Sequence, residues 1–225
     1  MQRPRMSGTD APETEAPKPK RTRDPVRSKQ TILRTAVAEF CQHGFSGARI
    51  ERIATKSKSN MRMIYHYFGD KEGLYLAVLE SAYTRIRQEE SKLDLSEMNP
   101  LEGMRTLIRF TFDFFAANTD VLSLISNENT LRAKYLKRLS NVREMTRPLV
   151  TSIEQLSTAG YNEGTFKTKV DPIQFYVSLV ALSQIHIVNR YTLSVLFEQD
   201  MAAPAWLSAR RSHVEDVLMS YLQLP

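Results

Sequence analysis

The chain has few of the residues on which disulfide-rich folds and metal sites depend. One cysteine, Cys41, occurs in 225 residues, which excludes an internal disulfide and a zinc site built only from cysteines. The four histidines show no metal-ligand spacing with acidic residues or with Cys41. The eight glycines form neither a phosphate-binding loop nor a nucleophile elbow. We therefore predict that the protein is not an enzyme, with no catalytic residues, metal or cofactor.

Long apolar runs are also missing. No segment approaches the ~20 apolar residues that a membrane-spanning helix needs, and the N-terminus lacks the apolar segment of a signal peptide. A single cysteine suits a reducing compartment. We expect a cytoplasmic protein that does not contact a membrane.

An excess of basic over acidic residues is missing from most of the chain and occurs only at its N-terminal end. Residues 1–70 contain 14 Lys or Arg against 7 Asp or Glu, whereas residues 71–225 contain 17 against 18. Positive charge confined to one end indicates a docking surface for a polyanion. Nucleic acid is therefore the first partner to consider.

Residues 1–24 are rich in Pro, Thr, Glu and Lys and have almost no large apolar side chain. Such a segment cannot bury enough surface to offset the entropy cost of ordering, so we expect a disordered tail. Its basic end, residues 18–23, is either a solubilising tail or an arm that contacts the DNA backbone or minor groove.

The remaining sequence shows helical spacing of apolar residues and no sustained strand alternation. Asp24-Pro25 and Asp171-Pro172 each combine a capping side chain with proline at the first helical position. The seventh helix is expected to bend at Pro148. The sequence predicts an all-α fold of about nine helices, over residues 25–44, 47–57, 60–68, 70–86, 100–115, 121–129, 131–158, 172–196 and 206–222.

Residues 49–74 have the layout of a helix-turn-helix, in which the second helix enters the major groove. Arg62 can bond a guanine edge or a phosphate, and Arg49 and Lys71 stand at helix starts that favour phosphate. Tyr65 and His66 either face the DNA or only pack. The residues predicted to contact DNA are Arg49, Asn60, Met61, Arg62, Tyr65, His66 and Lys71.

This segment resembles the amino-terminal domain of the tetracycline-repressor (TetR) family of bacterial transcriptional regulators. The family pattern is F-x-x-x-G, then I-A, a turn, and L-Y-x-H-F-x-x-K-E-x-L. Here it corresponds to Phe40 and Gly44, to Ile53-Ala54, and to residues 64–74. The resemblance covers about residues 27–87. It implies a DNA-binding domain over residues 25–87 and a helical ligand-binding and dimerisation domain over residues 88–225.

The chain departs from the family pattern at several positions. Ser57-Lys58-Ser59 replaces the usual Ala-Gly-Val turn, Asn60 the usual serine cap, Ala48-Arg49 the usual threonine pair, and Tyr67 the usual histidine. With these changes, the family pattern does not determine which bases of the operator this chain contacts. The segments G-F-x-G-x-R-x-E-x-I-A and K-E-G-L-Y-x-A-V-L resemble the pyrimidine-utilisation and nicotinate-type repressors of the family.

Residues 173–188 are apolar nearly all round, which predicts a helix buried on every side. One side of that helix would face the core and the other a matching helix of a second copy. The last helix supplies a second apolar stripe. We therefore predict a homodimer through the last two helices; the alternative is a central core helix in a monomer.

A small-molecule effector is expected in the second domain, with a small apolar or aromatic acid as its class. Arg109 and Asp113 are interpreted as a solvated ion pair. His186 is either a ligand contact or a satisfied core or interface residue. The predicted function is a ligand-responsive repressor that binds a palindromic operator as a dimer; the alternative is an architectural DNA-binding protein without an effector. The candidate effector contacts are Tyr83, Glu128, Asn129, His186 and Asn189.

Overall fold

The structure, a computed structural model, describes residues 24–223. Apart from Asp24, the tail predicted over residues 1–24 lies outside this range. The described residues form ten α-helices and no strand beyond one isolated bridge between Phe166 and Gln223, which confirms the all-α prediction. None of these helices is both long and apolar enough to cross a membrane. The helices are α1 (Pro25–Gly47), α2 (Ile50–Lys56), α3 (Met61–Phe68), α4 (Lys71–Glu90), α5 (Pro100–Ala117), α6 (Thr119–Thr130), α7 (Val142–Asn162), α8 (Pro172–Val188), α9 (Arg190–Leu196) and α10 (Pro204–Leu222).

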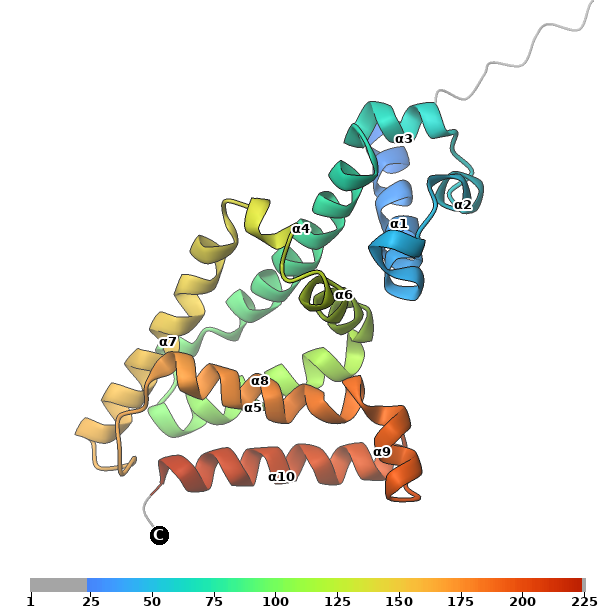
Figure 1. Cartoon of the computed structure of the whole chain (residues 1–225). Helices are drawn as coiled ribbons and strands as arrows, with labels where there is room; N and C mark the ends of the chain where they lie inside the picture. The colour runs from blue at the N-terminus through green and yellow to red at the C-terminus, as the bar shows by residue number, and fades with distance from the viewer. Residues whose placement is uncertain (1–23, 224–225) are drawn as a thin grey trace, which may run out of the picture.

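Helices α1 to α3 and the first turns of α4 form a small unit at one end of the molecule, which we call the head (Figure 1). The Asp24 side chain caps α1 by accepting the Val26 N–H at 3.0 Å. Ile32, Ala36 and Phe40 of α1 are buried at helical spacing. Gly44 then adopts φ 62°, a conformation that favours glycine, and interrupts the regular helix. The helical break predicted at Gly44 is therefore present.

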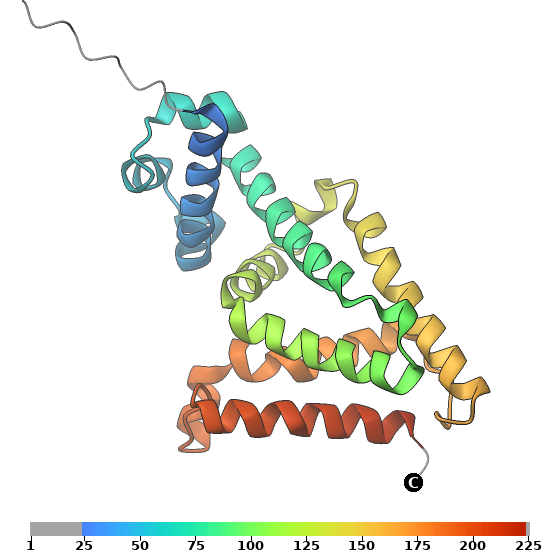
Figure 2. The same cartoon turned by 180° about the vertical axis from the view of Figure 1, so that it is seen from behind.

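Helices α5 to α10 form the second unit, which we call the body. Figure 1 and Figure 2 show α5, α8 and α10 lying across its base, with α7 at one side and α9 at the opposite end. A buried cluster joins these helices through Met104 and Leu107 of α5, Leu179 of α8, and Val214 and Leu218 of α10. Helix α4 runs from the head into the body without interruption.

Helix α6 joins the body to the head. The Asn127 side-chain amide donates to the carbonyl of Phe40 in α1 at 3.0 Å. The Cys41 thiol donates to the Asp120 carbonyl at 3.3 Å, and Arg85 of α4 makes a paired contact with the Asp120 carboxylate at 2.8 Å. Burial raises the pKa of Cys41 to about 12, so this thiol is a packing and hydrogen-bonding group.

The prediction of one helix over residues 131–158 is wrong for residues 131–141. Helix α6 ends at Thr130 and α7 begins at Val142. The Glu128 carboxylate accepts the N–H groups of Tyr135 and Leu136 at 2.6 and 2.8 Å, which folds the chain into turns. Helix α7 contains Pro148 in its interior.

Other boundaries also differ from the prediction. The predicted helix over residues 172–196 is divided at Asn189 into α8 and α9, which gives ten helices in the described residues where about nine were expected. The second helix begins at Ile50, later than residue 47, and the last begins at Pro204, earlier than Trp206. Arg109 does not pair with Asp113. Both reach α10, where Arg109 contacts Glu215 at 2.7 Å and Asp113 contacts Arg211 at 2.6 Å.

Candidate nucleic-acid interface

Helices α2 and α3 are joined by a short turn over residues 57–60. Lys58 adopts φ 53° in this turn, in the left-handed region where the family pattern has glycine. Asn60 caps α3, because its side-chain oxygen accepts the Met63 N–H at 2.8 Å. That oxygen therefore serves the helix, and the side-chain NH2 group of Asn60 remains available to DNA.

Helix α3 is anchored on one side and open on the other. Ile64 is completely buried and holds α3 against the head. Four of the predicted DNA contacts, Met61, Arg62, Tyr65 and His66, are exposed on α3. The exposed side of α3 thus combines a guanidinium, a phenol and an imidazole, groups able to bond base edges and phosphates.

Arg49 and Lys71 flank this helix from two other elements. Arg49 precedes α2, and its side chain is exposed. Lys71 begins α4, where its ammonium lies 4.9 Å from the centre of the Phe45 ring and donates to the Ser46 carbonyl at 3.4 Å. Burial, followed by the Arg52 charge, lowers the pKa of Lys71.

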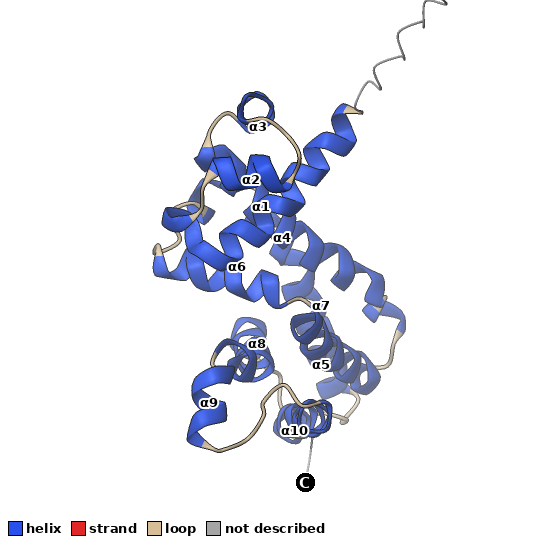
Figure 3. Cartoon of the chain, turned by 90° about the vertical axis from the view of Figure 1, so that its right-hand side faces the viewer, coloured by secondary structure: helices blue, strands red, loops and turns tan. Residues whose placement is uncertain are grey.

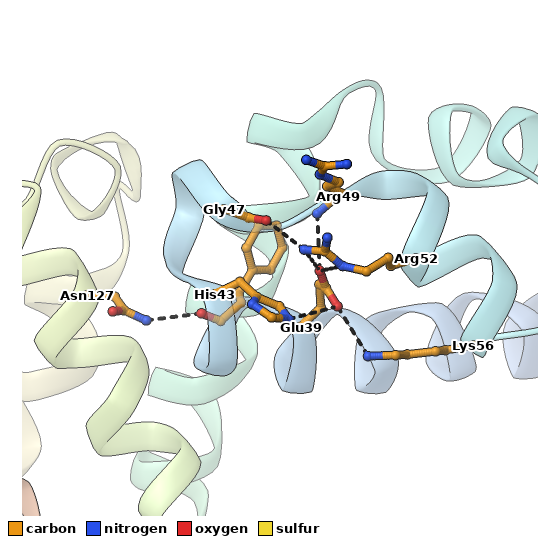
Figure 4. A network of polar contacts seen from close by, with 8 residues as sticks. Glu39, His43, Gly47, Arg49, Arg52, Lys56 and Asn127 are labelled. Carbon is orange, nitrogen blue, oxygen red and sulfur yellow. Dashed lines mark hydrogen bonds and ion pairs between the residues drawn. The ribbon is translucent and has the colours of Figure 1, made fainter.

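A buried carboxylate orients the start of α2 (Figure 4). Glu39 of α1 is fully buried, and its side chain accepts the Arg49 N–H at 3.2 Å and the Arg52 Nε–H at 2.6 Å. Lys56 donates to the second carboxylate oxygen at 3.3 Å, and His43 lies 3.9 Å from that oxygen. Arg52 also donates to the Gly47 carbonyl at 2.6 Å. These bonds fix α2 against α1 and so fix the platform beneath α3.

The electrostatics of Glu39 follow from these contacts. Burial alone raises the pKa of this carboxyl, but the hydrogen bonds from Arg52, Arg49 and Lys56 outweigh burial and hold the pKa below its usual value. Sequence reasoning missed Glu39. A signal was present, because Glu39 stands seven residues after Ile32 and three after Ala36, within the buried face of α1.

The structure divides the five candidate effector contacts among three places. Asn129 and Asn189 line one hollow of about 520 Å³ between α6 and α8, together with apolar residues such as Ile125, Leu182 and Ile185. Tyr83 and Glu128 lie outside this hollow. Glu128 of α6 is buried beside the Tyr135 backbone. Tyr83 is half-buried on α4, and burial raises the pKa of its phenol.

His186 is in the third place, inside the body. Its ring is stacked on Phe112 with centroids 5.2 Å apart and lies 5.2 Å from the Trp206 ring. Neither ring nitrogen has a hydrogen-bond partner among the described residues, and the same holds for the nearby Ser183 hydroxyl and Arg210 Nε. Burial and, to a lesser degree, the Arg210 charge lower the pKa of His186 to about 4. The imidazole is therefore neutral at pH 7.

Comparison with known proteins assigns both units. Residues 32–78 match the family described as bacterial regulatory proteins, tetR family, and residues 100–218 match the family described as tetracyclin repressor-like, C-terminal domain. The chain is similar to the HTH-type transcriptional repressor NicS of Pseudomonas putida, with 34% identity over 176 residues, 78% of this chain and 83% of NicS. It is also similar to the HTH-type transcriptional regulator RutR of Escherichia coli K12, with 28% identity, 76% of this chain and 78% of RutR.

Solved structures show the same fold. SCO4942 from Streptomyces coelicolor aligns with a TM-score of 0.66 and 22% identity, covering 88% of this chain and 99% of that one. The regulator FadR from Bacillus subtilis, solved in complex with stearoyl-CoA, aligns with a TM-score of 0.62 and 17% identity, covering 86% and 98%. The head has the geometry of a helix-turn-helix and the comparisons match both units, so the chain belongs to the TetR family of bacterial transcriptional regulators.

Proposed function

We propose that this regulator is a repressor that binds a palindromic operator as a homodimer and releases it when a small effector binds the body. The exposed side of α3, with Arg62, Tyr65 and His66 projecting from a helix anchored by Ile64, is the observation that carries the DNA-binding part of the proposal. In this proposal Arg62 reads a base, and Tyr65, Arg49 and Lys71 contact phosphates. Residues 25–87 act as the reading domain and residues 88–225 as the effector and dimerisation domain.

Exposed apolar side chains on the base of the body support the dimer. Ile173 and Val177 of α8 are 60% and 56% exposed, although the opposite side of α8 packs Phe175 and Leu179 into the core. Tyr221 of α10 adds to this surface. The helix predicted to be buried on every side is therefore open on one side in the single chain. A second copy would cover that side, and two heads would then read two half-sites.

The hollow between α6 and α8 is the proposed effector site. Its apolar walls and the two amides of Asn129 and Asn189 suit a small, largely apolar molecule with a polar anchor. Helix α6 forms one wall and also holds the head through Asn127. An effector that shifts α6 would move the head, and the coupling between effector and operator binding must be equal in both directions.

Operator binding tests the reading head. With a selected palindromic site, Arg62→Ala should weaken binding by about 1–3 kcal/mol and reduce discrimination among sites, whereas Lys71→Ala should weaken all sequences alike and lower the salt slope by about one. Arg147→Ala is the matched control, because Arg147 is exposed on α7 in the body. If Arg62→Ala and Lys71→Ala both behave like the control, the assignment of α3 is wrong.

Effector response tests the hollow. A library of small aromatic and aliphatic acids is screened for a rise in melting temperature and for loss of operator binding in the same samples. Asn129→Ala combined with Asn189→Ala should lower the sensitivity of both responses and leave ligand-free operator binding intact. A library that raises the melting temperature without releasing DNA would favour an architectural protein instead.

A further inference from the structure

Helix α9 presents an unusually apolar surface for a short surface helix. Tyr191, Val195, Leu196 and Phe197 are 72%, 79%, 71% and 67% exposed in the single chain. None of the residues of α9 itself is buried, so the helix contributes no side chain to the core of its own protomer. Three large apolar side chains on this short helix and a fourth directly after it, Phe197, mark a contact surface. Figure 3 shows α9 on the same side of the body as α8, away from α5 and α7.

The arrangement of head and body fixes how two copies can meet. Two heads contact one DNA duplex only if both point the same way, so the two-fold axis runs along the head-to-body direction. Helices α8 and α10 lie across that direction (Figure 1). The axis therefore runs nearly perpendicular to α8, and the two α8 helices of a dimer are antiparallel. The C-terminal end of one α8 then meets the N-terminal end of the other.

A hollow exists at that N-terminal end. It has a volume of about 550 Å³ between α8 and α10 and is lined by apolar residues that include Val170, Phe175, Val217 and Tyr221. Asp171 stands at its edge and caps α8. At the other end of α8, Arg190 begins α9 and its guanidinium lies 4.5 Å from the centre of the Tyr191 ring.

Sequence positions along α8 agree with this pairing. The midpoint between residues 171 and 190 falls between Val180 and Ala181, at the middle of α8 (Pro172–Val188). An axis through the middle of α8 therefore brings the Arg190 charge of one copy opposite the Asp171 charge of the other, and brings α9 over the apolar hollow. Apolar character and charge are complementary at the same register.

We propose that α9 is a docking arm that packs into the hollow between α8 and α10 of a second copy of this chain, with Arg190 paired to Asp171 of that copy. The inference rests on the dimer of the proposed function and extends it, because each copy contributes a separate arm and a separate receiving hollow. The dimer interface is then made of three helices from each protomer.

Cross-linking tests the register. In a Cys41→Ser background, one chain carries Gln174→Cys, in the receiving hollow, and another carries Tyr191→Cys, on the arm. A short bismaleimide should link the mixed chains. Each chain alone should stay unlinked, because an axis at the middle of α8 holds two copies of position 174 about 20 Å apart. The same axis places the two α9 helices at opposite ends of the paired α8 helices.

Sedimentation measures the contribution of the arm. Val195→Asp with Leu196→Asp should raise the dimer dissociation constant at least about tenfold, because two charges would enter a desolvated contact. Val26→Asp, at a position 64% exposed in the head, should leave the constant unchanged. Val177→Asp on α8 should also disrupt the dimer. This variant tests the dimer of the proposed function independently of α9.

The outcomes separate the two proposals. A monomeric wild-type protein at micromolar concentration would overturn the dimer and the arm together. A second outcome would overturn the arm alone. In it, the wild-type protein is a dimer that Val177→Asp disrupts, but the mixed cysteine chains do not link and the α9 substitutions leave the dissociation constant unchanged. Linking of the mixed chains together with weaker dimerisation of the α9 variant would establish the arm.

Discussion

The buried carboxylate of Glu39 gives the sharpest prediction about the head. Glu39→Gln keeps the shape of the side chain but removes its charge from the contacts with Arg52 and Lys56. Breaking a buried ion pair costs about 3–5 kcal/mol when the remaining charge stays buried. The side chains of Arg52 and Lys56 are 35% and 53% exposed and can hydrate, so the lower end of that range applies. We expect a loss of about 3 kcal/mol, or a fall in melting temperature of about 6–12 °C.

The measurement is urea unfolding followed by circular dichroism at one protein concentration, because the proposed dimer would make stability concentration-dependent. Glu89→Gln is the control: Glu89 pairs with Lys92 with side chains 42% and 66% exposed, and its substitution should cost less than about 1 kcal/mol. Because the pKa of Glu39 is lowered in the folded state, the charged carboxylate contributes fully to the free energy of unfolding at pH values above the unfolded-state pKa. This contribution is lost as the pH falls through the folded-state pKa, so the two proteins should converge in acid. If Glu39→Gln lowers the free energy of unfolding no more than Glu89→Gln does, the stabilising role of the buried carboxylate is refuted.

Three further predictions concern other positions. The pKa of His186 is lowered to about 4, so the folded state excludes a proton that the unfolded state binds below about pH 6.5. The free energy of unfolding should therefore fall by on the order of 3 kcal/mol as the pH falls from about 6.5 to about 4. His186→Phe should remove that fall in unfolding curves measured from about pH 7 to about pH 4. Lys58→Gly should stabilise the protein by about 1 kcal/mol in urea, because Lys58 has φ 53°, and no gain would contradict the strain argument. Gly160→Ala would place a methyl group 2.2 Å from the buried Phe166 ring and should cost about 1–3 kcal/mol, whereas an unchanged midpoint would show that the ring moves freely.

Local sequence signals predicted the head well. Asp24, Asn60 and Asp70 each accept an N–H at the start of a helix, as capping residues do, and Gly44 and Gly69 have positive φ at the breaks. Each of these features depends on neighbours within a few residues. The same local signals therefore account for the accurate boundaries of α3 and the accurate start of α4, whereas α4 ends at Glu90, four residues beyond the predicted end.

Features set by distant or buried partners were not predicted. Leu131, Tyr135 and Leu139 mimic a helical stripe, yet the buried Glu128 carboxylate captures two backbone N–H groups and turns the chain there. Periodicity could not show that Glu39 gathers partners 10 to 17 residues away. Composition alone could not show that His186 packs on Phe112 while Asn129 and Asn189 share a hollow, so the grouping of the candidate effector contacts required the structure.

The continuity of α4 has a mechanical consequence. Its twenty residues make a rod of about 30 Å that begins beneath α3 and ends beside α8, where Arg87 contacts the Tyr176 hydroxyl at 3.3 Å. No flexible linker absorbs motion between its ends, so the rod acts as a lever. A tilt of about 5° about the body end displaces Lys71 by about 2.6 Å, close to the roughly 3.4 Å rise of one base pair. Under the proposed function, small adjustments in the body would thereby be magnified into a change of register on the operator.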